Sequence, residues 1–197
     1  QHNEHQVVQH LVSQLLLGKK MALISDAGTP GISDAAFLLV RECLRVGVTV
    51  ECLPGPTAFV PALVNSGLPS NRFAFEGFLP LKKGRQTLLK KLAEEDRTLI
   101  FYESPHRLVR TLDEFQVYFG AERQCAVSRE LTKMHEENVQ GSLKKVADHF
   151  RQNHGTTRPG LDRALVSAVA ALQNFVQEMM IDEGSFFDRT WHGEYLY

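Results

Sequence analysis

Residues 25–34 read Ser25-Asp26-Ala27-Gly28-Thr29-Pro30-Gly31-Ile32-Ser33-Asp34, directly after the apolar run Met21 to Ile24 and before a helical pattern. This order predicts a strand over residues 21–25 that ends in a tight loop with exposed backbone. Open α/β sheets bind ligands at the carboxyl ends of their strands, where bare backbone and carboxylates suit a cofactor that carries amines and hydroxyls. The alternative is an ordinary strand-to-helix turn, which uses the same residue types.

A second loop of the same kind follows the next predicted strand. Helical spacing of apolar residues predicts a helix over residues 37–46, and residues 48–53 have the pattern of a strand. With the strand over 21–25 they form a βαβ unit, in which the two strands run parallel. Residues 54–58, Pro-Gly-Pro-Thr-Ala, follow the second strand and precede a helix that begins at Phe59. Both loops therefore open on one edge of the sheet, which predicts a shared ligand crevice.

The remaining chain alternates between predicted strands and helices. The expected elements are a helix over 7–16, a strand over 72–78, a helix over 86–95, a strand over 98–102, a helix over 106–119, strands over 124–129 and 137–140, and helices over 142–150 and 161–180. This order predicts an α/β protein with a first domain over residues 1–72, a second over 73–150, and a tail over 151–197.

Bulk composition excludes several classes of protein. The chain has 197 residues and a formal net charge of -1, so only a local patch could attract nucleic acid or an anionic membrane. Three widely spaced cysteines fit neither a disulfide framework nor a zinc site. Neither a membrane-spanning run nor a signal peptide is present, which predicts a cytoplasmic protein. The serine-hydrolase elbow, the Walker loop and the complete dinucleotide fingerprint are also missing.

A basic cluster follows the boundary between the two predicted domains, with no acidic residue inside it: Lys82, Lys83, Arg85, Lys90 and Lys91. Such a cluster can bind the phosphates of a polynucleotide. The alternative is a solvated surface, because short charge runs are common on helices and loops. Lys90 and Lys91 lie within a predicted helix. Lys82 and Lys83 lie in the loop before it and are the stronger candidates.

Two further strand ends carry polar side chains. Tyr102, Glu103 and Arg107 surround the turn that starts the next helix, and a role at the domain interface competes with simple helix capping. The segment from Ser128 to Glu137 concentrates an Arg, a Lys, a His and three Glu, which suits acid–base chemistry or phosphate binding. A salt-bridged surface turn is the alternative there. No second His follows at helical spacing, so a metal site is not expected.

Six of these motifs occur in the order and spacing of one enzyme family. They are Ser25 to Asp34, Leu53 to Ala58, Ser66 to Pro69, Phe75 to Pro80, Phe101 to Arg107, and Arg129 to Lys133. Across residues 5–150 the chain closely resembles the bacterial small-subunit ribosomal RNA cytidine 2′-O-ribose methyltransferases of the tetrapyrrole methylase superfamily. The resemblance implies a homodimer of two-domain α/β subunits, with a mainly parallel first sheet, a mixed second sheet, and S-adenosylmethionine between the domains.

The resemblance also assigns roles to individual residues. Those implied to hold the cofactor are Asp26, Gly28, Thr29, Gly31, Ile32, Thr57, Ala58, Tyr102 and Glu103. Glu130 and Lys133 are implied to face the RNA ribose, where either could assist deprotonation of the 2′-hydroxyl. Lys82, Lys83, Arg85, Arg107 and Arg129 are the expected contacts to RNA phosphates.

Three departures from the family pattern bear on activity, of which the smallest is Asp34-Ala35-Ala36 in place of the more usual Asp-Pro-Gly at a helix start. The family begins with a strand, a loop, a helix and a second strand that do not precede Gln1, so an incomplete first domain is expected. The tail from Arg158 onward does not match the apolar strand that ends the family's second domain, which would leave sheet edges uncovered unless a partner or the tail fills them. Two alternatives therefore stay open: a tetrapyrrole C-methyltransferase, and a noncatalytic RNA-binding or dimerising relic.

Overall fold

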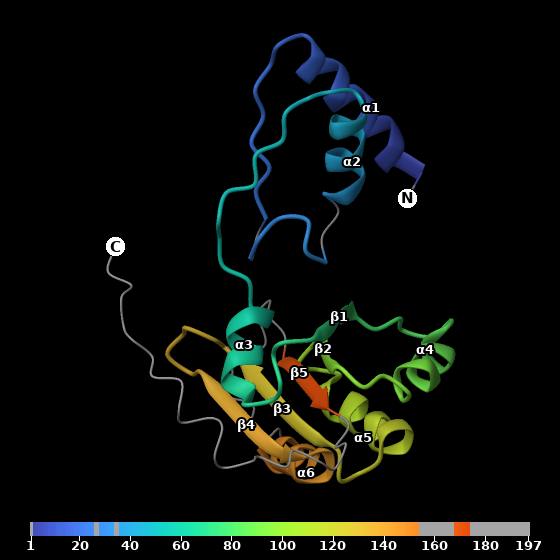
Figure 1. The fold of residues 1–197 in the computed structure, drawn as a ribbon, viewed down its shortest axis with the longest axis vertical. Helices are drawn as coiled ribbons and strands as arrows, with labels where there is room; N and C mark the ends of the chain where they lie inside the picture. The colour runs from blue at the N-terminus through green and yellow to red at the C-terminus, as the bar shows by residue number, and fades with distance from the viewer. Residues whose placement is uncertain (1, 26–27, 34–35, 154–167, 174–197) are drawn as a thin grey trace, which may run out of the picture.

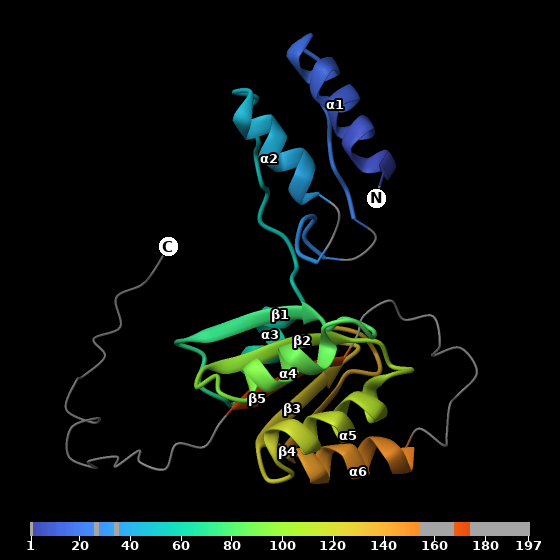
Figure 2. The same ribbon diagram turned by 90° about the vertical axis from the view of Figure 1, so that its right-hand side faces the viewer.

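The computed structural model describes residues 2–25, 28–33, 36–153 and 168–173 of the chain. Its first part is a helical pair formed by α1 (His2–Leu16) and α2 (Phe37–Arg45). Val8 and Val12 of α1 pack with Cys43 of α2 in a small apolar cluster. Figures 1 and 2 show this pair set apart from the sheet; the segment after α1 turns back to α2, and the segment after α2 runs down to α3. These segments carry the two loops that the sequence singles out.

The strands predicted over residues 21–25 and 48–53 are not formed, and this part of the prediction is wrong for the structure. Both segments lack regular secondary structure. A strand needs a hydrogen-bonding neighbour, and none of the described residues pairs with either segment. Several of their apolar side chains are consequently exposed, with exposed fractions of 51%, 87% and 78% for Leu23, Ile24 and Leu53. Both segments have the residue pattern of a strand, but no neighbouring strand among the described residues forms hydrogen bonds with them.

The second part is a five-stranded sheet with the order β1-β2-β5-β3-β4. Its strands are β1 (Phe73–Phe78), β2 (Thr98–Glu103), β3 (Gln124–Arg129), β4 (Glu137–Ser142) and β5 (Ala168–Gln173). β1 runs parallel to β2, whereas β5 runs antiparallel to both β2 and β3. It follows that β1, β2 and β3 all point the same way and that their carboxyl ends lie along one edge. We call this the strand-end edge.

The helix predicted over residues 161–180 is wrong where the structure describes this segment, because β5 lies there. Residues 168–173 form a strand that pairs with β2 on one side and with β3 on the other. The segment Ala168-Val169-Ala170-Ala171-Leu172-Gln173 has good helix formers, but propensity is a weak prior that tertiary context overrides. Here two unpaired strand edges offer hydrogen bonds along its whole length. The rest of the predicted helix lies outside the described residues.

Helices cover both faces of the sheet. α3 (Phe59–Ser66) lies on one face, and α4 (Arg85–Leu92), α5 (Leu108–Phe119) and α6 (Leu143–Asn153) lie on the other (Figures 1 and 2). β2 alternates between the two layers. Leu99 and Phe101 join the large core under α4 to α6, whereas Ile100 packs with Ala62 and Leu63 of α3. The period of two along β2 therefore builds both cores.

The predicted elements between residues 72 and 150 are confirmed, with ends shifted by a few residues. α3 lies before the expected domain boundary at residue 72, yet it packs on the sheet of the second part. This places the start of α3, which directly follows the second loop, against the sheet that carries Tyr102. The second loop is thereby anchored at its carboxyl side to the strand-end edge.

Candidate functional site

The two glycine- and proline-containing loops touch each other. The Thr29 hydroxyl donates a hydrogen bond to the Pro56 carbonyl oxygen at 3.1 Å. Gly28 has a φ of +75°, and a Cβ there would lie 3.4 Å from the same carbonyl oxygen. At Gly55 a Cβ would lie 3.6 Å from the Thr29 hydroxyl. The positive φ of Gly28 favours glycine there, whereas a Cβ at Gly55 would make only an ordinary van der Waals contact.

The first loop also reaches the strand-end edge of the sheet. Gly77 sits at a register shift in β1 and has a φ of +59°. A Cβ at Gly77 would come within 2.8 Å of the Ser33 hydroxyl oxygen, closer than real Cβ contacts allow. Ser33 therefore rests against bare backbone, and the first loop meets the second part of the molecule near the end of β1. Gly31 (φ +89°) and the half-exposed Ile32 lie in the same loop.

Tyr102 stands at the centre of this edge. Its ring meets Phe75 edge-on at a centroid distance of 5.0 Å and lies 5.5 Å from the ring of Phe78. Burial raises the pKa of the Tyr102 phenol, and a hydrogen bond from the backbone of Phe59 opposes that rise only in part. Phe59 begins α3 directly after Thr57 and Ala58. Tyr102 thus connects β2 with the second loop.

Glu103 lies beneath Tyr102 on the opposite face of the sheet. The carboxylate is buried, and it accepts hydrogen bonds from the Ser104 backbone N–H at 2.7 Å and the Thr111 hydroxyl at 2.8 Å. Arg107 pairs with it at 2.8 Å. These contacts shape the turn between β2 and α5, because they hold its first residues against α5. The structure therefore places Glu103 and Arg107 in one ion pair that frames the turn.

Arg85 was predicted to contact an RNA phosphate, and the structure gives it a different role. Its guanidinium is buried, with the residue only 9% exposed. Nε donates to Glu114 at 2.7 Å, Nη1 donates to the Pro80 carbonyl at 3.2 Å, and Nη2 donates to the Thr111 hydroxyl at 3.1 Å. An RNA phosphate could reach this group only by breaking the network. Arg85 therefore anchors α4 to α5, and the prediction of a phosphate contact is wrong.

The exposed lysines remain where the sequence predicts them. Lys82 and Lys83 are both exposed in the loop that follows β1, and the Lys82 carbonyl accepts the Arg85 backbone N–H at 3.3 Å. Since that loop leaves the sheet at the end of β1, the two ammonium groups belong to the same side of the domain as the strand-end edge. Lys90 and Lys91 are exposed as well, in the last turn of α4.

The loop of residues 130–136, between β3 and β4, is the third feature at this edge. Glu130 and Thr132 have φ values of +51° and +64°, which are uncommon for residues other than glycine. Between them, Leu131 packs on the apolar cluster that contains Tyr102 and Ile100. The Lys133 ammonium pairs with the Glu130 carboxylate at 3.2 Å, with side-chain exposures of 51% and 13%. Both predicted acid–base residues therefore face each other in a strained loop.

Arg129, the remaining predicted RNA contact, is held by a neighbouring strand. It lies opposite Glu137 in the β3–β4 ladder, and its Nε donates to the Glu137 carboxylate. His149 of α6 bonds the other oxygen of Glu137 at 2.8 Å. Burial raises the pKa of Glu137, but the hydrogen bonds from His149 and Arg129 outweigh burial and leave that pKa below its ordinary value. Glu137 is therefore ionised at neutral pH.

Most of the predicted cofactor residues lie near the strand-end edge. They come from both loops and from the end of β2. Asp26 lies outside the described residues, and its role stays a prediction. Sequence reasoning missed the contributions of Ser33, Phe59 and Gly77. The positive φ of Gly77 has no signature in a single sequence, although a glycine inside a strand pattern is itself a signal of a bulge or a close approach.

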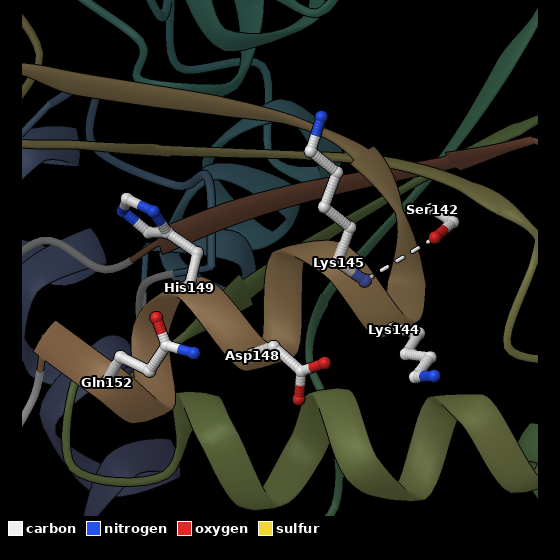
Figure 3. A pocket seen from close by; sticks show the side chains of 6 residues that line it. All are labelled: Ser142, Lys144, Lys145, Asp148, His149 and Gln152. Carbon is white, nitrogen blue, oxygen red and sulfur yellow. Dashed lines mark hydrogen bonds between the residues drawn. The ribbon is translucent and has the colours of Figure 1, made fainter.

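Other features lie away from this edge. A polar hollow of about 410 Å³ opens on the outer face of α6 (Figure 3), lined by Ser142, Lys144, Lys145, Asp148, His149 and Gln152. None of these residues belongs to the predicted site. The described ranges contain no group of three potential metal ligands. Among the helices that the structure describes, none is long and apolar enough to cross a membrane.

Comparison with known proteins identifies the family to which this fold belongs. The sequence profile described as Tetrapyrrole (Corrin/Porphyrin) Methylases matches residues 1–147. The chain belongs to the tetrapyrrole methylase family. Its α/β architecture is shared with solved structures, of which CobJ, described as a methyltransferase, superposes with a TM-score of 0.59 at 20% identity, covering 85% of this chain and 70% of that one.

A second solved relative was crystallised with a ligand. The uroporphyrin-III C-methyl transferase from Thermus thermophilus, complexed with S-adenyl homocysteine, superposes with a TM-score of 0.53 at 21% identity, covering 87% of this chain and 74% of that one. At such identities the likeness concerns the fold alone. The resemblance to this family that the motifs indicate is confirmed.

Sequence relatives are much closer. "Ribosomal RNA small subunit methyltransferase I" of Synechocystis is 48% identical over 153 residues, which are 77% of this chain and 55% of that protein. The proteins of the same name from Xylella fastidiosa and Thermotoga maritima are 50% and 42% identical, covering 78% and 76% of this chain and 58% and 67% of theirs. The chain thus spans between half and two thirds of the length of these relatives.

Proposed function

We propose that this chain is the site-bearing part of an S-adenosylmethionine-dependent methyltransferase that methylates the 2′-hydroxyl of a cytidine in small-subunit ribosomal RNA. The observation that carries the proposal is the contact between the Thr29 hydroxyl and the Pro56 carbonyl at 3.1 Å, which joins the two marked loops beside the strand-end edge. The name shared by relatives at 42 to 52% identity supports the choice of ribosomal RNA. The tetrapyrrole methyltransferases among the structural neighbours are only about 20% identical.

The residues at this edge suit the cofactor. Bare backbone at Gly28, Gly31 and Gly55 would let amide and carbonyl groups approach it closely. Thr57, Ala58 and Tyr102 would line the other side. We assign Glu103 an indirect part, since its buried carboxylate holds the turn that follows Tyr102. S-adenosylmethionine, when bound, supplies an electrophilic methyl group on a sulfonium.

The strained β3–β4 loop would bind and activate the ribose hydroxyl that accepts the methyl group. Methyl transfer to a hydroxyl is an in-line displacement, so alignment supplies much of the rate and removal of the hydroxyl proton is the second demand. The Glu130 carboxylate can accept that proton, and the Lys133 ammonium beside it can stabilise negative charge on the ribose oxygen. Arg107, Arg129, Lys82 and Lys83 are the proposed cations for the phosphates. We further propose a homodimer that acts in the cytoplasm.

Titration calorimetry with S-adenosylmethionine, followed by methyl incorporation into purified small-subunit RNA, tests the function. We expect saturable binding and a single 2′-O-methylated cytidine, located by mass spectrometry of nuclease fragments. Binding with methylation of a tetrapyrrole, and not of RNA, would favour the C-methyltransferase. RNA binding without any heat from millimolar cofactor would favour the relic.

The two loop lysines give a separate prediction for RNA affinity. Replacing Lys82 and Lys83 by alanine should reduce the slope of log affinity against log salt by about 2, since each neutralised phosphate contributes about 0.9 to that slope. Filter-binding titrations between low and high salt measure it. The control is the double alanine variant of Lys90 and Lys91, which removes the same charge from exposed positions on α4. Equal slopes for the two double variants would refute a role for the loop.

A further inference from the structure

Glu136 ties the middle of the β3–β4 loop to the start of β4. One carboxylate oxygen accepts the Thr132 backbone N–H at 2.7 Å, and the other accepts the side-chain amide of Asn138 at 2.9 Å. Thr132 is one of the two residues of this loop with a positive φ. Because the bond ends on the amide of that residue, it stabilises the uncommon backbone conformation itself.

Glu137 ties the beginning of the same loop to α6. Its two oxygens take the Arg129 guanidinium and the His149 imidazole. Arg129 is the last residue of β3, directly before Glu130. Figure 3 shows His149 projecting from the outer side of α6. The loop is therefore clamped at its entrance and at its centre by two adjacent carboxylates, and all four of their oxygens have donors.

The conformation that these carboxylates hold is costly. Left-handed backbone at Glu130 and Thr132 persists only where the surroundings over-determine it, and such strain gathers at functional sites. Leu131 adds a third restraint, because it is packed on the cluster around Ile100 and Tyr102. With these restraints the pair formed by Glu130 and Lys133 keeps one place at the strand-end edge.

We propose that Glu136 and Glu137 are positioning residues, which hold the β3–β4 loop in its strained conformation before the RNA binds. The inference rests on the proposed function for its consequence in catalysis, since the held loop carries Glu130 and Lys133. Both carboxylates act through the loop, because their oxygens are occupied by protein donors. A loop that is already in its final conformation keeps Glu130 and Lys133 in place. Misplaced reacting groups would lower the rate of methyl transfer.

Amide hydrogen exchange tests the positioning directly, without any need for activity. In the Glu136→Ala chain the Thr132 amide should exchange at least about tenfold faster, the effect of losing one hydrogen bond from a held amide. Glu136→Gln keeps one acceptor oxygen and should fall between that variant and the parent. The control is Glu122→Ala, an exposed residue before the opposite end of β3. An unchanged Thr132 amide in Glu136→Ala would overturn the proposal.

The Thr132→Gly substitution shows whether Glu136 stabilises the positive φ of residue 132 or only makes a surface contact with it. Glycine adopts a positive φ without steric cost, so the backbone no longer depends on the carboxylate. In the Thr132→Gly background, Glu136→Ala should then change the exchange of neighbouring loop amides by less than about twofold. The same large effect in both backgrounds would show that Glu136 does not act by holding Thr132, and the proposal would fall.

Kinetics connects the loop with methyl transfer. Glu136→Ala and Glu137→Gln should each lower kcat at least about tenfold while the KM for S-adenosylmethionine stays within about twofold, because the cofactor loops are not altered. A loss confined to that KM would overturn the positioning role. A parent chain without methyl transfer would instead refute the proposed function, and the exchange measurements would still decide what the two carboxylates do.

Discussion

A chain with Ala170→Pro should lose at least about 3 kcal/mol of folding free energy, a large part of the roughly 5–15 kcal/mol that an ordinary domain has. Ala170 lies in β5 between Phe101 of β2 and Val127 of β3. In a strand flanked on both sides every backbone N–H meets a neighbour, so proline removes a ladder bond and its ring pushes a neighbouring strand away. Urea unfolding followed by far-ultraviolet circular dichroism measures the loss.

The matched control is Ala170→Ser, which keeps the backbone N–H and adds a single oxygen atom. We expect it to unfold within about 1 kcal/mol of the parent, the ordinary range for a mild substitution. If proline and serine at position 170 have the same effect, β5 contributes little to the sheet. β2 and β3 must then be joined in another way, and the central place of residues 168–173 would be wrong.

Gly77→Val should weaken S-adenosylmethionine binding by tenfold or more. Valine at Gly77 would drive into Ser33, because even its Cβ would lie 2.8 Å from the Ser33 hydroxyl oxygen. We expect the added Cβ and γ-methyl groups to push Ser33, and with it the first loop that carries Gly28 and Thr29, away from the strand-end edge. Calorimetric titration of the cofactor measures the affinity. The proposed function underlies this expectation, whereas the close approach of position 77 to Ser33 follows from the geometry alone.

Gly67→Val is the control for backbone strain. Gly67 has a φ of +65°, much like the +59° of Gly77, but a Cβ there would meet nothing within 4 Å. Both variants carry the penalty of a left-handed side chain, about 1–2 kcal/mol, and only one displaces the loop. Adding Ser33→Gly to Gly77→Val should restore the affinity, since it removes the opposing hydroxyl. Equal affinities for the two valine variants would exclude a role for the Ser33–Gly77 contact.

How far the site could be foreseen differs between its parts. The loops at residues 25–34 and 54–58 were recognisable because glycine and proline mark them in the chain. Their mutual contact followed from the expected edge of one parallel sheet, and the contact is present although the two strands of that sheet are not formed. The role of Arg85 was not predictable, because a basic run in a sequence does not reveal which guanidinium is buried against Thr111 and Glu114.

The sequence by itself determined the local elements from residue 72 to 150 and the chemistry of the loops, since periodicity, capping residues and turn residues are properties of neighbours along the chain. Only the tertiary structure decided that residues 168–173 form the middle strand and that residues 21–25 and 48–53 form none. A strand exists only where a second backbone completes its hydrogen bonds, and that partner is chosen in space. The contact of Ser33 with Gly77 also joins residues far apart in the chain and was likewise decided by the tertiary structure.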